Sequence, residues 1–263
     1  MIARPVRRAV LVTGSTSGIG LGVARRFAAA GYDVGLNSFE PPEQVQGVLG
    51  ELQGAFETCE IVYFQADLAT GNGGELVQRF LDWFGRMDVL VNNAGIQKVA
   101  PVDEFDPADW ERVRTIILDA AFETVRAALP DMKSRQNGRI INIASAHALV
   151  ASPYKSAYVS AKHGVMGLTR TVALEVAEQG ITVNAICPGY VLTPLVEKQL
   201  EDQARAHGIS REEVKKQIML APQPTGQFVR IEEVAELALY LCGDLARSIT
   251  GTSIAIDGGW TAR

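Results

Sequence analysis

The sequence is poor in the features that mark several large classes of protein. Its three cysteines, Cys59, Cys187 and Cys242, are an odd number without metal-ligand spacing, which predicts unpaired thiols in a reducing compartment and no metal site. A formal net charge of -5 and a pI near 5.4 leave no basic surface for nucleic acid. The apolar run at 9–12 is too short for a signal-peptide core or a membrane span. These absences predict a cytoplasmic protein that binds neither nucleic acid nor membranes.

The chain does contain a regular alternation of short apolar runs and longer amphipathic stretches. With 263 residues, 47% of them hydrophobic, it is long enough to bury one sizeable core. Most of the apolar runs lack in/out alternation, which is typical of strands that are buried on both faces of a parallel sheet. The predicted strands are residues 9–13, 33–37, 60–64, 88–92, 139–144, 181–186 and 253–257.

Seven strands that alternate with helices predict an α/β fold with right-handed crossovers. We expect a single domain over 1–263, a Rossmann-type doubly wound sheet of seven mainly parallel strands with helices on both faces. One helix should begin at Asp106-Pro107, where aspartate can cap and proline suits the first helical position. The one long insertion, 190–226, precedes a helix that begins near Ile231. It is predicted to form mobile, substrate-covering helices at the carboxyl edge of the sheet, where open α/β sheets bind ligands.

A glycine-rich loop, T-G-S-T-S-G-I-G at 13–20, follows the first predicted strand and opens a helix. Glycines at 14, 18 and 20 allow a sharp turn and a close approach of the backbone to a pyrophosphate, which faces the helix N-terminus. A glycine triplet alone is weak evidence. The strand–turn–helix context makes it a prediction of dinucleotide binding.

The choice of dinucleotide is read at the end of the second predicted strand, around 37–40. A 2′-phosphate needs a cationic partner, and neither Ser17 nor Ser38 supplies one. No aspartate stands at the strand end, although Glu40 is a substitute acceptor for the ribose hydroxyls. NAD is therefore predicted by default. Asp67, after the third strand, is placed to meet the adenine edge, or it is a plain exposed carboxylate.

Residues 145–164 contain two tyrosines, two lysines and two histidines, but only one Tyr–Lys pair has helical spacing. Tyr158 and Lys162 are four residues apart, so they lie on one face of a helix. A free phenol has a pKa of about 10 and is a poor base at neutral pH. A nearby ammonium stabilises the phenolate and lowers that pKa, which suits proton transfer between an alcohol and a ketone. Tyr-x-x-x-Lys also occurs by chance.

The whole chain resembles the short-chain dehydrogenase/reductase family. The resemblance rests on the glycine loop, N-N-A-G at 92–95, Ser145 at a strand end, Y-V-S-A-K at 158–162 and P-G-Y-V-L-T at 188–193. It implies that Ser145 hydrogen-bonds the substrate oxygen, that Tyr158 moves the proton, and that Lys162 holds the nicotinamide ribose while acidifying Tyr158. It also implies a cofactor site made of Thr13, Gly14, Ser17, Gly18, Ile19, Gly20, Phe39, Asp67, Leu68, Asn93, Ala94, Gly95, Tyr158, Lys162, Pro188, Gly189, Val191 and Thr193.

Further strings resemble the branch of this family that oxidises (R)-3-hydroxybutyrate to acetoacetate: N-N-A-G-I-Q, N-I-A-S-A-H, K-S-A-Y-V-S-A-K-H-G, T-P-L-V-E-K-Q and D-G-G-W-T-A-R. The resemblance implies a small hydroxy-acid substrate and a homotetramer that pairs helices at about 107–133 and 156–179 and the final strand region. Tyr154 and His163 are expected mostly to pack. The implied carboxylate ligands are Gln97, His147, Lys155 and Gln199, and the implied walls near the methyl end are Tyr190 and Trp260.

Two positions depart from the pattern. Ile117 stands where most of the family has an asparagine that holds a proton-relaying water, so we expect proton exchange with solvent to be impaired but not abolished. Tyr190 stands where the branch commonly carries tryptophan, and this smaller, more polar side chain weakens the expectation of a four-carbon substrate. The alternatives are a reductase for another hydroxy acid or a 3-oxoacyl thioester, and a non-catalytic dinucleotide-binding sensor or partner protein.

Overall fold

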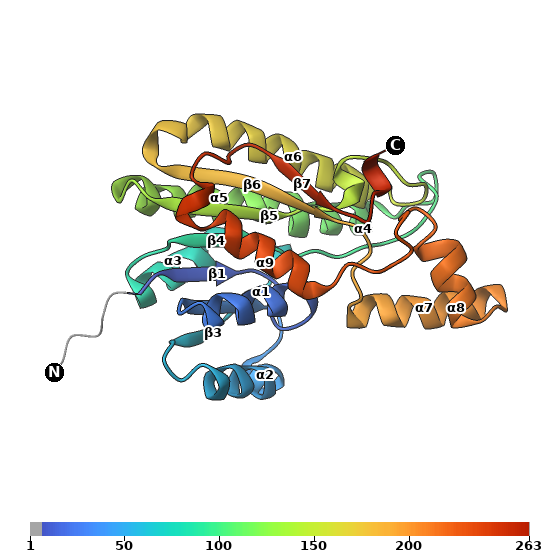
Figure 1. The fold of residues 1–263 in the computed structure, drawn as a ribbon, viewed down its shortest axis with the longest axis horizontal. Helices are drawn as coiled ribbons and strands as arrows, with labels where there is room; N and C mark the ends of the chain where they lie inside the picture. The colour runs from blue at the N-terminus through green and yellow to red at the C-terminus, as the bar shows by residue number, and fades with distance from the viewer. Residues whose placement is uncertain (1–6, 263) are drawn as a thin grey trace.

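Seven strands form one sheet in the order β3-β2-β1-β4-β5-β6-β7, and every neighbouring pair is parallel (Figure 1). The computed structural model describes residues 7–262, except for the side chains of residues 195, 198, 199, 202, 203, 206 and 207. The order confirms the predicted doubly wound sheet, with wholly parallel strands. The strands are β1 (Ala9–Val12), β2 (Asp33–Ser38), β3 (Ile61–Gln65), β4 (Val89–Asn92), β5 (Gly138–Ile143), β6 (Ile181–Pro188) and β7 (Ser253–Ile256).

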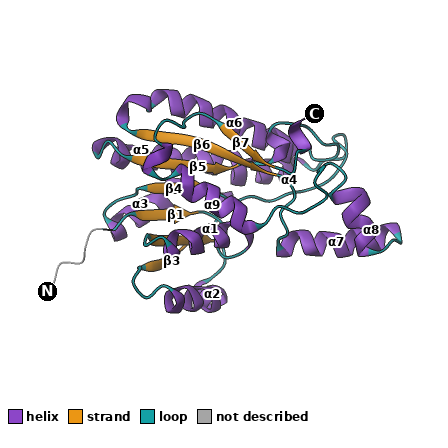
Figure 2. Ribbon diagram, in the orientation of Figure 1, coloured by secondary structure: helices purple, strands orange, loops and turns teal. Residues whose placement is uncertain are grey.

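Helices cover both faces of the sheet (Figure 2). One apolar layer joins the sheet to α1, α2 and α9, and the other joins it to α3, α5 and α6. The helices are α1 (Gly18–Ala29), α2 (Pro42–Ala55), α3 (Gly73–Phe84), α4 (Pro107–Arg114), α5 (Ala120–Ser134), α6 (Ser156–Glu175), α7 (Pro194–His207), α8 (Arg211–Val214) and α9 (Ile231–Leu241). Short 3-10 or π turns are η1 (Leu68–Thr70), η2 (Thr115–Asp119), η3 (Ala146–Ala148), η4 (Ala177–Gln179), η5 (Lys215–Met219), η6 (Asp244–Ala246) and η7 (Trp260–Ala262).

Strand β1 shows why the predicted strands read as unbroken apolar runs. Val10 and Val12 pack into the layer of α1 and α9, while Ala9 and Leu11 pack into the layer of α3 and α5. None of the four is more than 1% exposed. A strand between two helical layers has no polar face, because both of its faces are core.

The segment 190–226 leaves the end of β6 and forms α7, α8 and η5 beyond the carboxyl ends of the strands (Figure 1). These elements pack on each other through Leu200, Val214 and Met219. The segment is helical in the structure, and both its mobility and its role in covering the substrate stay predictions. Within residues 7–262, the structure contains no helix with the length and apolar character needed to span a membrane.

Candidate active site

The glycine loop and the turn after β4 form one hydrogen-bonded unit. The hydroxyl of Thr13 accepts hydrogen bonds from the backbone N–H groups of Asn93 at 3.0 Å and Ala94 at 3.1 Å, and the Asn93 side chain donates to the carbonyls of Thr13 and Gly14 at 2.9 Å. A Cβ on Gly14 would lie 2.9 Å from Cα of Ala94, and one on Gly20 would lie 2.3 Å from the carbonyl of Gly14. This bare backbone cradle at the N-terminus of α1 fits a pyrophosphate.

A cleft of about 410 Å³ extends from this loop to α6. It brings most of the predicted cofactor residues together, along with Gln97 from the predicted substrate set. Thr13 and Gly20 support the loop, whereas Pro188, Gly189 and Val191 lie at and after the end of β6 and are not among the residues of this wall. The predicted residues on the wall are Gly14, Ser17, Gly18, Ile19, Phe39, Asp67, Leu68, Asn93, Ala94, Gly95, Tyr158, Lys162 and Thr193.

The cleft also has residues that were not predicted, among them Thr16, Arg112 and Ile116, and it includes Asn37, which the sequence indicated only as part of the region 37–40. Asn37 accepts from the N–H of Gly14 at 3.3 Å, and its amide donates to backbone carbonyls at the end of β3, so it ties the loop to the sheet. Asn37 could have been predicted from the sequence, because it is a polar residue that directly follows the apolar run of its strand. Arg112 and Ile116 reach the cleft from α4 and η2, and no sequence spacing connects them to the glycine loop.

The acid–base residues lie where β5 meets α6. Lys162 is 5% exposed, donates to the carbonyl of Ile143 at 2.6 Å, and has its Nζ 5.6 Å from the centroid of the Tyr158 ring. Burial lowers the pKa of Lys162 to about 8. Ser145 follows β5 and interacts with the Tyr158 hydroxyl. The helix therefore presents Tyr158 and Lys162 on one face, as their spacing predicts.

The pKa of Tyr158 is raised, which differs from the prediction that Lys162 lowers it. Burial disfavours the phenolate, and the hydrogen bond with Ser145 offsets this only in part. The Lys162 ammonium is directed to the Ile143 carbonyl instead of the phenol oxygen, and burial disfavours its charge as well. The pair alone therefore leaves the phenol protonated at neutral pH, and a further positive charge is needed to stabilise the phenolate.

Four of the predicted substrate residues form a cluster beside Tyr158. The ring of His147 makes edge contacts with Tyr158, at a centroid distance of 6.0 Å, and with Trp260, at 4.9 Å. Trp260 stacks on Tyr190 with centroids 5.6 Å apart and planes 10° apart. The ammonium of Lys155 donates to the Tyr190 hydroxyl at 3.3 Å. The structure thus assembles a polar and aromatic cluster of side chains next to the acid–base pair.

His147 has a buried nitrogen that is free to bind a ligand. It is 5% exposed, and its buried Nε2 has no hydrogen-bond partner among residues 7–262. Its Nδ1 lies 3.4 Å from the Ser145 hydroxyl. Burial, followed by the charge of Lys155, lowers the pKa of His147 to about 4, so the imidazole is neutral at pH 7. With its proton on Nε2, a neutral imidazole can donate one hydrogen bond to an acceptor such as a carboxylate oxygen.

The remaining predicted residues lie apart from this cluster. Gln199 is in α7, and its side chain falls outside the described residues. Tyr154 and His163 were expected to pack, which is wrong for both, because both are exposed. Tyr154 is 60% exposed on a loop with φ of 64°, and His163 is bonded at 2.9 Å to the carbonyl of Val159 on its own helix. One residue beyond Lys162 is about 100° around the helix, which turns His163 to the solvent.

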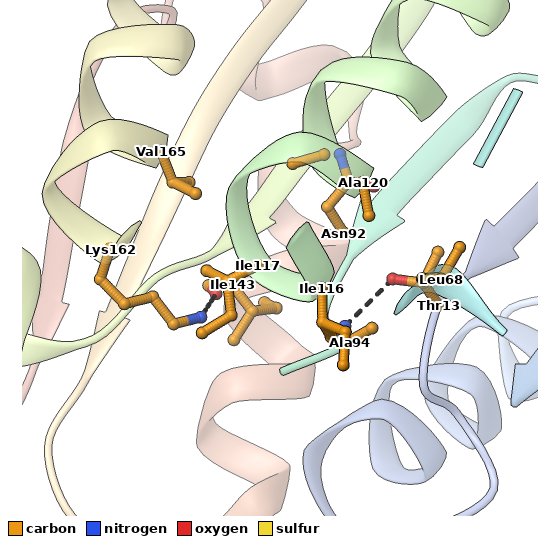
Figure 3. Close-up of a pocket in the computed structure, with 11 residues that line it drawn as sticks. Thr13, Leu68, Asn92, Ala94, Ile116, Ile117, Ala120, Ile143, Lys162 and Val165 are labelled. Atoms are coloured by element: carbon orange, nitrogen blue, oxygen red, sulfur yellow. Dashed lines mark hydrogen bonds between the residues drawn. The ribbon is translucent and has the colours of Figure 1, made fainter. Parts of the chain in front are cut away.

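Ile117 borders a cavity of about 10 Å³ beside Lys162, enough for about one water molecule (Figure 3). Thr13 lines the same cavity through the side chain that holds Ala94. The Ile117 side chain is 4% exposed and offers no hydrogen-bonding group, so a water here would depend on backbone atoms and on the other polar residues that line the cavity, Thr13, Asn92 and Lys162. Impaired proton exchange with solvent stays a prediction.

The chain matches the family model of the short chain dehydrogenases over residues 8–204 and belongs to this family of oxidoreductases. It is 52% identical over 257 residues to the D-beta-hydroxybutyrate dehydrogenase of Rhizobium meliloti (strain 1021), covering 97% of this chain and 99% of that one. It is 47% identical to the D-beta-hydroxybutyrate dehydrogenase of Cupriavidus necator, with 97% and 98% covered. These relatives confirm the predicted family and the resemblance to its hydroxybutyrate branch.

A solved structure supports the fold. A protein from Agrobacterium tumefaciens, described as a candidate 2-deoxy-D-gluconate 3-dehydrogenase and crystallised with bound NADP, superposes with a TM-score of 0.82. It is 32% identical in sequence, and the match covers 97% of each chain. The Rossmann-type architecture of the family is therefore confirmed for this chain.

Proposed function

We propose that this protein catalyses the NAD-dependent, reversible oxidation of (R)-3-hydroxybutyrate to acetoacetate. The observation that carries the proposal is the unpartnered, buried Nε2 of His147 in the cluster that also holds the Lys155 ammonium. A donor and a cation beside Tyr158 suit a small acid whose carboxylate is close to its reacting hydroxyl. The names of the two hydroxybutyrate relatives support the same substrate. Gln97 and Gln199 are proposed to complete the carboxylate site.

The proposed mechanism assigns the proton to Tyr158 and the substrate oxygen to Ser145. In the reducing direction the protonated Tyr158 donates to the forming hydroxyl, while Ser145 stabilises the developing charge on that oxygen. In the oxidising direction Tyr158 takes the proton back. Lys162 and Thr193, which both line the cleft, are proposed to hold and orient the dinucleotide. When bound, the oxidised nicotinamide supplies a hydride acceptor and the positive charge that the Tyr158 phenolate lacks here.

The decisive assay follows NADH absorbance with purified protein, NAD and (R)-3-hydroxybutyrate. We expect turnover with the (R) acid and NAD, and little with the (S) acid or NADP. A carrier-bound 3-oxoacyl thioester has no carboxylate for Lys155 and His147, so its reduction without turnover of the acid would favour the thioester reductase. Tight NADH binding without turnover of any hydroxy acid would favour the non-catalytic sensor.

The preference for NAD is supported by the position of Glu40. Its Oε2 accepts hydrogen bonds from the hydroxyls of Thr16 at 3.0 Å and Ser38 at 2.8 Å, so the carboxylate is fixed at the wall of the cofactor cleft. Its other oxygen has no partner among the described residues. This place, just after β2, is where the adenosine ribose lies in folds of this type. A fixed carboxylate there can accept from a ribose hydroxyl and repels a 2′-phosphate.

Replacing Glu40 by glutamine should relax this preference. The variant keeps the side chain's size and removes its charge, so we expect the Kd for NADPH to fall about tenfold, or about 1.4 kcal/mol. The expected change in binding free energy is smaller than the repulsion of about 4 kcal/mol between two unit charges about 4 Å apart near a protein surface. The Kd for NADH should change less than about threefold. Fluorescence titration of both dinucleotides measures the effect.

The matched control is Glu43→Gln, which removes the same charge from an exposed position three residues away on α2. We expect no change for either dinucleotide. An equal gain in NADPH affinity in both variants would mean that net charge, and not the placement of Glu40, governs the choice. An unchanged NADPH affinity in Glu40→Gln would contradict the assignment.

A further inference from the structure

We propose that the Tyr190 hydroxyl is a third donor to the substrate carboxylate, oriented for this role by Lys155. The inference rests on the proposed function and deepens it. It also reassigns Tyr190, which was expected at the methyl end of the substrate. Three features carry it: the fixed backbone of Tyr190, the fixed plane of its ring, and the direction of its hydroxyl hydrogen bond.

The backbone of Tyr190 is held on both sides. Its N–H donates to the side-chain oxygen of Gln223, and its carbonyl accepts from the N–H of Val229 at 2.9 Å. Gln223 is 1% exposed and donates to the carbonyl of Gln227 at 2.7 Å, which fixes the orientation of its amide. A Cβ on Gly189 would lie 2.4 Å from the same Gln223 oxygen, so the segment is also tightly packed. These contacts fix the backbone position from which the Tyr190 side chain extends.

The ring of Tyr190 is fixed by stacking on Trp260. Trp260 in turn begins the turn η7, which Asp257 caps by accepting from the N–H groups of Gly259 at 3.0 Å and Thr261 at 2.9 Å. Asp257 is 6% exposed, so this cap is shielded from water. A ring stacked on a fixed partner holds its hydroxyl at one defined point of the cluster.

The hydrogen bond from Lys155 makes the Tyr190 oxygen an acceptor and leaves the hydroxyl proton as a donor. An ammonium can only donate, so the phenol oxygen accepts this bond and keeps its own proton for another acceptor. No group among the described residues accepts that proton. The Lys155 Nζ also lies 5.6 Å from the centroid of the Tyr190 ring, a cation–π contact that holds the two side chains together.

Among the described residues, this cluster thus has three groups that can donate to a ligand, and none of those residues accepts from Nε2 of His147 or from the Tyr190 hydroxyl. The donors are the Lys155 ammonium, the Tyr190 hydroxyl and the neutral imidazole of His147, whose ring contacts Trp260 as the Tyr190 ring does. A carboxylate has two oxygens and about four acceptor sites, and it gains most from donors that are already in place. The geometry points to recognition of the acid through a cation, a phenol and an imidazole together.

The test compares an acid with its ester in Tyr190→Phe, which keeps the stacked ring and removes the hydroxyl. We expect the KM for acetoacetate to rise about tenfold while kcat changes less than about twofold. The KM for methyl acetoacetate, which has no anionic carboxylate, should not change. The matched control is Tyr154→Phe, which removes an exposed phenol hydroxyl from the nearby loop and should alter neither KM.

Two results would overturn the inference: an unchanged KM for acetoacetate, or equal losses for the acid and the ester, which would indicate packing alone. Failure of the proposed function is a separate result, namely wild-type protein that does not turn over (R)-3-hydroxybutyrate. In that case the variants are compared by titrating NADH-loaded protein with acetate and with acetamide. Equal acetate affinity in wild type and Tyr190→Phe then overturns the inference independently.

Discussion

Replacing Tyr158 by phenylalanine is expected to reduce kcat about a thousandfold in both directions, because it removes the only proton carrier that we assign to the reacting oxygen. The ring of Tyr158 packs with Ile117, Ala161 and other apolar residues, and phenylalanine preserves those contacts. The Kd for NADH should therefore stay within about threefold of wild type. Steady-state kinetics and NADH fluorescence titration measure the two quantities. Turnover within about tenfold of wild type would contradict the assigned role.

The pH dependence of the wild type provides a second readout of the same residue. Oxidation requires the Tyr158 phenolate, and the pKa of this buried phenol is raised, so kcat/KM for oxidation should increase with pH above neutrality. Reduction requires the protonated phenol and the Lys162 ammonium. Because the pKa of Lys162 is about 8, reduction should be nearly flat below this pH and fall above it. A reduction rate that rises from pH 7 to pH 9 would contradict both assignments.

The sequence predicted those features that depend on local periodicity. β1 was recognisable because both of its faces are core, and Tyr158 and Lys162 were paired because helix geometry alone sets their relation. The cap at Asp106 was also predicted, and its side chain accepts from the N–H of Ala108 at 2.8 Å. Each of these inferences needs only a few neighbouring residues.

The features that were missed or wrong depend on residues far apart in the chain. Glu40 was named as an acceptor, but its hydrogen bond with Thr16, 24 residues earlier, was missed, as was the contact of Lys155 with Tyr190 across 35 residues. The direction of the Tyr158 pKa followed from burial by the assembled fold, which no spacing reveals. The homotetramer and the mobility of the segment 190–226 stay predictions, because both concern states beyond one static chain.

The second large effect is expected from Gly20→Ala in the phosphate cradle. The added Cβ would lie 2.3 Å from the carbonyl of Gly14, 2.5 Å from the Asn93 side-chain nitrogen and 2.9 Å from Cα of Ser15. These atoms cannot move aside without a loss of hydrogen bonds, because the Asn93 side chain donates at 2.9 Å to the carbonyls of both Thr13 and Gly14. The loop must therefore open to admit the methyl group.

Opening this loop removes the backbone surface that approaches the pyrophosphate. We expect the Kd for NADH to rise about a hundredfold, or about 2.7 kcal/mol. The free energy of unfolding should fall by about 1–3 kcal/mol, as overpacking usually costs. The matched control is Gly50→Ala in α2, where a Cβ meets nothing within 4 Å. It should leave NADH binding unchanged and raise stability by up to about 1 kcal/mol.

Circular dichroism and chemical denaturation separate loss of the cradle from loss of the fold. A Gly20→Ala protein with the wild-type spectrum, a lower unfolding midpoint and a hundredfold weaker NADH affinity is the expected result. Binding of NADH at wild-type affinity would mean that the loop accommodates the methyl group without moving. The close contact between α1 and the glycine loop would then not form the dinucleotide site. The turn at Asn93 and Ala94 would instead be the part of the backbone that binds the pyrophosphate.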